Sequence, residues 1–157
     1  MSRFVLLVVL FFACSSSLGE VDFEAKVIKI ADGDTITVLR EGSVQVKIRL
    51  ADIDCPERGQ PWGHNAADAF KKALTNDTVG IEVLDKDRYG RTIARVYVNS
   101  VSMNRYLVES GNCWIYPKYA KDQKLFALQD AAKSTGKGLW QLPESERVPP
   151  WEWRQKK

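Results

Sequence analysis

The chain has 157 residues, a length that fits a single domain. Hydrophobic residues make up 45% of it and charged residues 27%, a balance that excludes a disordered or fibrous chain. The net charge of +3 permits a polyanionic partner without indicating one, while three Cys and one His are too few for a zinc-finger framework and disfavour a mechanism built on histidine.

Residues 1–19 have the pattern of a secretory signal peptide. Arg3 precedes an apolar run over residues 4–13, and small residues follow that run. The run is shorter than the about 20 apolar residues that a bilayer-spanning helix needs. We therefore predict an exported protein, secreted or periplasmic. The alternative is that residues 1–19 form a buried first helix of the fold. A lipid anchor on Cys14 is a further alternative, because Phe12-Ala13-Cys14 loosely resembles a bacterial lipoprotein site.

Five short strands and three helices are predicted after that segment. The first three strands are rich in Val and Ile and are joined by two turn signals, Asp32-Gly33 and Glu41-Gly42, which indicates a meander. The set predicts a mixed α and β fold, namely a closed five-stranded OB-type β-barrel packed by about three α-helices, an architecture that often binds oligonucleotides. The predicted strands cover residues 23–31, 35–39, 44–50, 79–83 and 92–98, and the predicted helices cover residues 64–75, a segment around 103–107, and residues 121–134.

Residues 44–50 carry the cleanest pattern in the chain. Val, Ile and Leu side chains alternate there with Gln, Lys and Arg, which is the period of two expected of a strand with one buried face. The aliphatic side therefore faces a core. Arg49 belongs to the other set, so we predict that it points away from that core.

The main domain is predicted to span residues 20–144, followed by a Pro/Trp/basic tail over residues 145–157. We expect the tail to be extended, with its two Trp packed on the domain and its basic end in water. Export would place Cys55 and Cys113 in an oxidising compartment, where they could pair. Two small buried thiols are the alternative, and the sequence leaves this choice open.

Four short polar motifs are candidates for chemistry. Each has an ordinary structural explanation when taken alone: a turn, a solvated arginine, a loop or helix entry, and a hairpin connector. Together they supply oxygen ligands for a hard cation such as Ca²⁺, planar guanidinium groups for phosphate, and a further carboxylate that can take a proton from water. Hydrolysis of a phosphodiester needs this combination. The motifs are Asp32-Gly33-Asp34-Thr35, Arg49, Asp54-Cys55-Pro56-Glu57 and Asp87-Arg88-Tyr89-Gly90-Arg91.

These motifs resemble those of the thermonuclease family, which includes the secreted staphylococcal (micrococcal) nuclease. The similarity covers about residues 24–140, nearly all of the chain after the predicted signal peptide. Three ordered motifs with compatible spacing make it specific. The matching stretches are Val27 to Thr35, Ile48-Arg49-Leu50 leading to Asp54-Cys55-Pro56-Glu57, Asp87 to Arg91, Leu107 to Gly111, and Gly138-Leu139-Trp140.

The resemblance implies one bound Ca²⁺ ion. Asp34 and Asp54 match the carboxylate ligands of the family, and Cys55 stands where the family uses the main-chain carbonyl of a Thr. Because only a main-chain oxygen is needed at that position, the departure is tolerable. It does place a thiol beside the metal, and a disulfide to Cys113 would affect that loop.

The resemblance also implies the catalytic residues. Glu57 matches the general base, and Arg49 and Arg91 match two phosphate-binding arginines, of which Arg91 would help the leaving group depart. Tyr89 falls where a family Tyr contacts a nucleotide phosphate, and Tyr116 is expected to line the nucleotide pocket.

The implied substrates are DNA and RNA, preferably single-stranded or locally opened, cut to 3′-phosphorylated products. No obligate protein partner is indicated, and a monomer is expected. The alternative from another class is a non-catalytic OB-fold module of the cell envelope that binds nucleic acid without cutting it. An envelope protein with a purely structural task is a third hypothesis, suggested only by the export signal.

Overall fold

The computed structural model describes residues 21–156, so the predicted signal peptide and Cys14 lie outside the described residues. The strands are close to those predicted, with three additional short ones. They are β1 (Phe23–Ile30), β2 (Thr35–Arg40), β3 (Val44–Leu50), β4 (Ile53–Asp54), β5 (Thr78–Lys86), β6 (Thr92–Val98), β7 (Val101–Ser102) and β8 (Trp114–Ile115).

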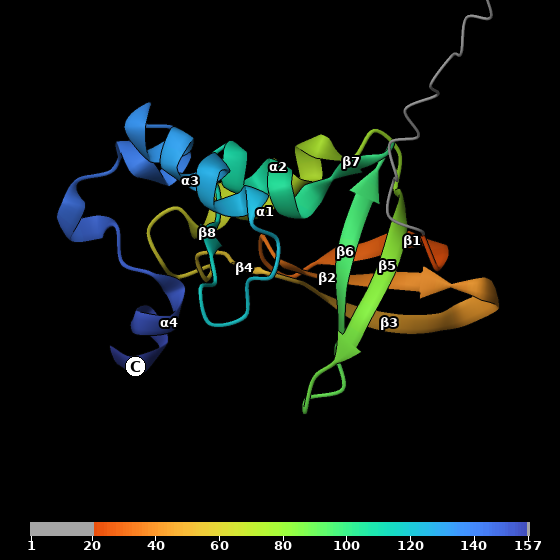
Figure 1. The fold of residues 1–157 in the computed structure, drawn as a ribbon. Coiled ribbons are helices and arrows are strands. Elements are labelled where there is room, and N and C mark those ends of the chain that lie inside the picture. Colours follow the sequence, from red (N-terminus) through yellow and green to blue (C-terminus); the bar gives the residue numbers. More distant parts are fainter. Residues whose placement is uncertain (1–20, 157) are drawn as a thin grey trace, which may run out of the picture.

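The five longer strands close into a barrel (Figure 1). The strand order is β3-β2-β1-β5-β6-β7, with antiparallel neighbours, and an additional parallel pairing joins β3 to β6. That pairing connects strands from opposite parts of the order and thereby closes the sheet. The short pair β4–β8 lies outside the barrel. The predicted mixed fold with a five-stranded OB-type barrel is confirmed.

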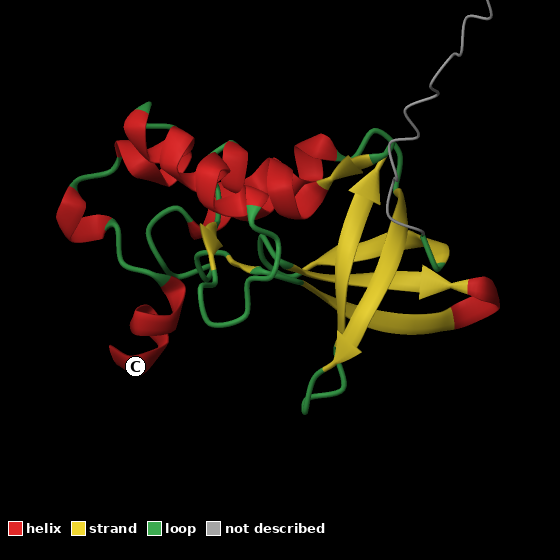
Figure 2. Ribbon diagram, viewed as in Figure 1, coloured by secondary structure: helices red, strands yellow, loops and turns green. Residues whose placement is uncertain are grey.

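The helices α1 (Gly63–Ala73), α2 (Met103–Glu109) and α3 (Lys124–Ser134) gather on one side of the barrel (Figure 2). Helix α2 packs against both of the others and against β6. The apolar stripe of α1 places Ala66 and Phe70 in the core. Within residues 21–156, none of the helices combines the length and the apolar character needed to cross a bilayer.

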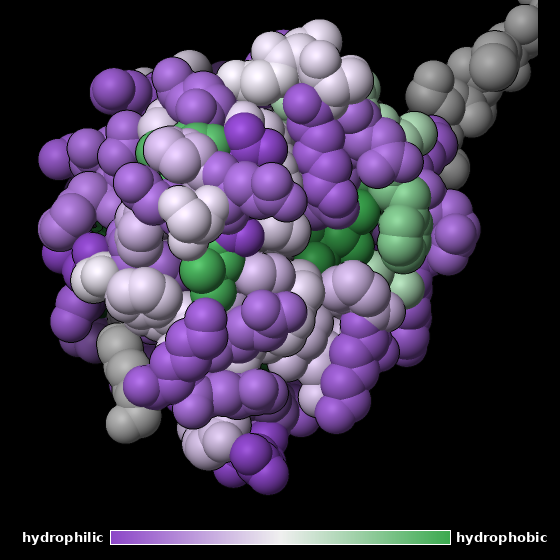
Figure 3. Space-filling model, turned by 90° about the vertical axis from the view of Figure 1, so that its left-hand side faces the viewer, coloured by the Kyte–Doolittle hydropathy of each residue, from purple (hydrophilic) through white to green (hydrophobic). Residues whose placement is uncertain are grey.

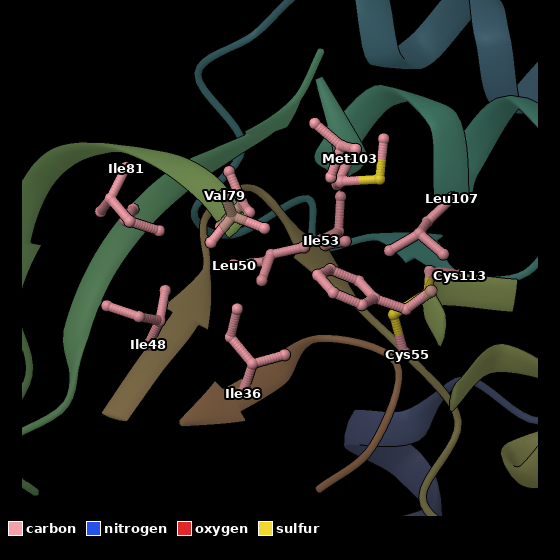
Figure 4. Packing of buried hydrophobic residues seen from close by; sticks show 14 of the residues in the cluster. Ile36, Ile48, Leu50, Ile53, Cys55, Val79, Ile81, Met103, Leu107 and Cys113 are labelled. Atoms are coloured by element: carbon pink, nitrogen blue, oxygen red, sulfur yellow. A yellow bond between two sulfur atoms is a disulfide. The ribbon is translucent and has the colours of Figure 1, made fainter. Parts of the chain in front are cut away.

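One continuous core runs from the barrel interior to the helices (Figure 4). Ile48 and Leu50 face it, as the alternation of residues 44–50 predicts. Val44 belongs to the same alternating set but is 61% exposed, because it stands at the other end of β3, next to the turn that follows β2. At the helical end of the core, a disulfide joins Cys55 to Cys113.

The C-terminal tail differs from the prediction. Residues 150–153 form a short helix, α4 (Pro150–Trp153), and residues 154–156 continue as a 3₁₀ turn. Proline is tolerated in the first turn of a helix, where its missing N–H has no intrahelical partner, so Pro150 starts α4 instead of preventing it. The expectation of an extended tail was therefore wrong. The basic end also does not stay wholly in water, since Arg154 pairs with carboxylates of the main domain.

Candidate active site

Asp34 stands at the tip of the β1–β2 hairpin, packed against the segment that carries Cys55. A Cβ on Gly33 would lie 2.9 Å from the Cβ atoms of both Ala66 and Cys55, so only glycine allows this close approach. The Cys55 amide donates to Asp34 Oδ2 at 2.5 Å. The turn therefore buries the Asp34 carboxylate beside Cys55, which lies between Asp54 and Glu57 in the chain.

Arg49 joins the two carboxylates that were predicted as metal ligands. Its Nη2 donates to Asp54 Oδ1 at 2.9 Å and lies 3.3 Å from Asp34 Oδ2. Its Nη1 donates to the carbonyls of Leu50 at 2.7 Å and Ile53 at 2.9 Å. The side chain points away from the barrel core, as predicted, but it is only 12% exposed. Arg49 is thus a clamp between the carboxylates.

A tight turn between β3 and β4 makes that clamp possible. Asp52 adopts φ 69°, a left-handed conformation that Asp tolerates better than most residues. Its carboxylate accepts from the Lys121 amide at 2.7 Å, and its carbonyl accepts from the Tyr116 amide at 2.9 Å. Sequence reasoning did not single out Asp52, because a second acidic residue two positions before Asp54 has no local signature of its own.

Glu57 follows the buried Pro56 and is linked to the same cluster through Arg154, a residue that no sequence motif indicates. Arg154 Nη1 donates to Glu57 Oε1 at 3.0 Å and to Asp54 Oδ1 at 3.2 Å, while its Nη2 donates to Asp54 Oδ2 at 2.7 Å. Gln60, also not predicted, accepts from the Glu57 amide at 3.2 Å and donates to the carbonyl of Val148 at 2.5 Å. The C-terminal segment is therefore bound to the loop that carries Glu57.

Arg91 is not in contact with this cluster. It follows Gly90, which has φ 79°, and its Nε donates to Asp87 Oδ2 at 2.7 Å. In the parallel β3–β6 register Ile93 pairs with Arg49, so alternation places Arg91 on the same outward face, about 7 Å back along the strand. Tyr89, in the same connector, is 70% exposed, and its hydroxyl accepts from Arg88. Arg91 is therefore expected on the same face of the barrel as Arg49, but its guanidinium pairs with Asp87 in its own connector.

Tyr116 lies just after β8 and belongs to an aromatic group. Its ring stacks on that of Trp151 in α4, with centroids 5.3 Å apart and planes 3° apart. Trp151 also contacts Trp114 edge to face at 6.0 Å. Beside the Tyr116–Trp151 pair is a shallow hollow of about 360 Å³, which Pro117, Lys118 and Gln155 also line. The ring that was predicted to line the nucleotide pocket is thus paired with a ring from the tail.

A comparison with known protein families matches residues 47–142 to the family described as staphylococcal nuclease homologues. The chain belongs to the staphylococcal nuclease family. The matched region contains Arg49, Asp54, Glu57 and Arg91, while Asp34 precedes it and Arg154 follows it.

Curated relatives with nuclease names are similar in sequence to this chain over most of their own length. An Escherichia coli protein named "Uncharacterized endonuclease" is 36% identical over 137 residues, which is 87% of this chain and 88% of that protein. A Shigella flexneri protein named "Micrococcal nuclease" is 34% identical over 144 residues, 85% of this chain and 80% of that protein. A Haemophilus influenzae "Uncharacterized endonuclease" is 34% identical over 145 residues, 92% and 80% of the two chains. Membership of the staphylococcal nuclease family supports nuclease function over a non-catalytic binding module.

The donor set of the cluster fits a hard cation. Asp34 and Asp54 offer carboxylate oxygens, which Ca²⁺ prefers, and it completes its shell with backbone carbonyls and water. No group of three or more His, Cys, Asp or Glu side chains within residues 21–156 is arranged to hold a metal ion. A metal at this point would therefore depend on two side chains, main-chain oxygen such as the carbonyl of Cys55, and solvent. The disulfide leaves that carbonyl chemically unchanged, since it uses only the side chain of Cys55.

The buried Asp34 carboxylate makes the metal-free protein sensitive to pH. Burial raises the pKa of Asp34 from 3.8 to about 7, and the neighbouring Arg49 guanidinium offsets part of that rise. The folded protein then binds this proton more tightly than the unfolded chain. Ionisation of Asp34 therefore lowers folding stability as the pH rises from about 4 to about 7.

We compare Asp34→Asn with the wild type, both in chelator. As the pH rises from about 5 to about 7.5, the stability of the variant relative to the wild type should increase, because only the wild type ionises a buried Asp34. Thermal unfolding followed by circular dichroism measures the difference in midpoint at each pH. Asp77→Asn is the control, because Asp77 is exposed and pairs only loosely with Lys26 at 3.8 Å. Its midpoints should run parallel to those of the wild type. Parallel midpoints for Asp34→Asn as well would contradict the raised pKa.

Proposed function

We propose that the chain is an exported, calcium-dependent nuclease that hydrolyses phosphodiester bonds of DNA and RNA and leaves 3′-phosphorylated products. The observation that carries this proposal is the position of Arg49. Arg49 bridges Asp34 at the tip of the first hairpin and Asp54 in β4. Glu57 is linked to the same Asp54 through the guanidinium of Arg154, which donates to both carboxylates. Four of the predicted residues, from three segments of the chain, therefore meet at one point.

The roles follow from the chemistry of each side chain. Asp34 and Asp54, with the carbonyl of Cys55, would hold one Ca²⁺ ion, which supplies positive charge beside the scissile phosphate when bound. Arg49 lies between both carboxylates and would add charge next to a phosphate oxygen. Glu57 is about one third exposed, so its carboxylate can reach a water molecule. Glu57 is not among the proposed metal ligands, so it is the acidic residue assigned to act as the base.

In the proposed reaction, Glu57 takes a proton from water and the resulting hydroxide attacks phosphorus. The bond from phosphorus to the 5′ oxygen breaks, that oxygen takes a proton from solvent water, and Glu57 later returns its proton to solvent, so a 3′-phosphate and a 5′-hydroxyl result. Arg91 pairs with Asp87 at 2.7 Å. Once its guanidinium has left Asp87, Arg91 would stabilise the departing oxygen. An arginine side chain is long enough to cover the about 7 Å that separates its strand position from the level of Arg49.

The calcium dependence is tested by incubating plasmid DNA and RNA with the protein in Ca²⁺, in Mg²⁺, and in chelator. We expect cleavage in Ca²⁺ and intact nucleic acid in chelator. The products should be extended by a polymerase only after phosphatase treatment, because a 3′-phosphate blocks extension. Undiminished cleavage in chelator would contradict the metal requirement, and intact nucleic acid under all three conditions would contradict nuclease activity.

The face of the molecule that carries the C-terminal segment is mostly polar (Figure 3). Figure 3 shows the side of the molecule on which α4 and the C-terminal end lie in Figure 1, and most of that face is hydrophilic, with small apolar areas.

We propose that the protein acts as a monomer without an obligate protein partner. Export to the cell exterior or the periplasm is supported by the Cys55–Cys113 disulfide, since such bonds persist in oxidising compartments.

A further inference from the structure

Arg154 is a cation that the C-terminal segment supplies to the carboxylate cluster. Helix α4 and the turn after it lie beyond residues 47–142, the region that matches the staphylococcal nuclease family. The Arg154 guanidinium contacts both oxygens of Asp54 and one oxygen of Glu57. These two residues are a proposed metal ligand and the proposed base.

Asp54 already contacts two cations, Arg49 and Arg154, which leave little room for a metal ion. Each carboxylate oxygen offers about two lone-pair positions. Oδ1 accepts from Arg49 Nη2 at 2.9 Å and from Arg154 Nη1 at 3.2 Å, which fills both. Oδ2 accepts from Arg154 Nη2 at 2.7 Å. Departure of Arg154 would leave one open position on Oδ1 and two on Oδ2, and would remove a positive charge beside both oxygens, so Arg154 and a metal ion compete for the same carboxylate.

The same segment covers the ring predicted to line the nucleotide pocket. Trp151 stacks on Tyr116 with planes only 3° apart, as a nucleobase would stack on an aromatic side chain. Trp151 lies three residues before Arg154, about one helical turn away, so both side chains can reach the site from the same segment. One short segment therefore occupies a face of the pocket ring and the carboxylates together.

The attachment of this segment is limited. Helix α4 has four residues, and a helix of that length has little stability of its own. Besides the Arg154 ion pairs and the ring contacts of Trp151, the segment is held by the burial of Pro150 and by the hydrogen bond from Gln60 to the carbonyl of Val148 at 2.5 Å. The Arg154 side chain is 40% exposed, so solvent already reaches the ion pairs. Loss of a few contacts would thus release it.

We propose that residues 148–156 form an autoinhibitory strap. In the closed state, Arg154 takes the place of a bound cation at Asp54 and blocks Glu57, while Trp151 covers Tyr116. Ca²⁺ and nucleic acid bind when the strap leaves. The inference rests on the proposed function, because it assigns Asp54 to the metal and Glu57 to the base.

Calorimetric titration of chelator-stripped protein with Ca²⁺, without nucleic acid, tests the competition. Arg154→Gln should bind Ca²⁺ about tenfold more tightly than the wild type, because a half-exposed positive charge beside the ligand has been removed. Lys156→Gln is the matched control. It removes the same charge two residues further on, from an exposed side chain, and should leave the affinity unchanged.

Hydrogen exchange provides a second measurement on the wild type. Ca²⁺ should increase exchange at the amides of residues 152–154, which are bonded within α4 and its cap while the strap is closed. Unchanged or weaker Ca²⁺ binding by Arg154→Gln would overturn the strap while leaving the nuclease intact, as would exchange that Ca²⁺ does not alter. Absence of Ca²⁺ binding by every variant would instead remove the calcium site of the proposed function, and the competition with it.

Discussion

Glu57→Gln is expected to lower the rate of phosphodiester hydrolysis by about 10²–10⁴-fold, the usual contribution of a positioned general base. The amide has nearly the same shape as the carboxylate but cannot accept a proton from water. Folding stability should change little, because the side chain is about one third exposed and Arg154 keeps its contacts with Asp54. The measurement is the turnover rate at saturating Ca²⁺ and substrate, alongside thermal unfolding.

Glu146→Gln is the matched control for this change. Glu146 is exposed and lies in a 3₁₀ turn of the segment between the main domain and the strap, so the same loss of charge should leave turnover unchanged. An unchanged rate in Glu57→Gln would remove Glu57 from the role of base. A large loss of stability together with lost turnover would indicate a structural role instead.

Much of the barrel could be predicted from local patterns. Alternation in residues 44–50 places Ile48 and Leu50 inside and Arg49 outside, and the Asp32-Gly33 turn carries Asp34 to the position where it meets Cys55. Such features depend on neighbours within a few residues, which the sequence displays directly. The same holds for the helices, whose apolar spacing is a local property.

The contacts of Arg154 could not be predicted in this way. Its partners Asp54 and Glu57 are about a hundred residues earlier in the chain, at separations of 100 and 97. An arginine in a basic tail has the same local pattern whether it is solvated or paired. The Cys55–Cys113 pairing was left open for the same reason, since 58 residues separate the two thiols.

The position of Arg91 shows a different limit of sequence reasoning. The connector motif correctly indicates a hairpin between β5 and β6, and the register places Arg91 on the face of Arg49. The direction of its guanidinium depends on Asp87, which is four residues away and competes with any phosphate. A motif lists the charged groups but does not decide which of them pair when substrate is absent.

Arg49→Met is expected to lower the free energy of unfolding by about 3–5 kcal/mol in the absence of metal, the usual cost of removing one partner from a buried ion pair. Two buried carboxylates, Asp34 and Asp54, would lose the guanidinium that lies between them. The carbonyls of Leu50 and Ile53 would also lose their donor. Turnover should fall by about 10²–10³-fold through loss of charge beside the phosphate. Urea unfolding in chelator measures the first effect.

Calcium distinguishes this explanation from a general packing defect. Because the carboxylates remain, Ca²⁺ should stabilise Arg49→Met more than it stabilises the wild type, as a ligand that binds only the folded state does. Arg105→Met is the control. Arg105 pairs with Asp122 at 2.6 Å but is 42% exposed, so its loss should cost about 1 kcal/mol or less and should not respond to Ca²⁺. A similarly small loss in Arg49→Met, or an equal response of both variants to Ca²⁺, would mean that Arg49 does not hold the two carboxylates together.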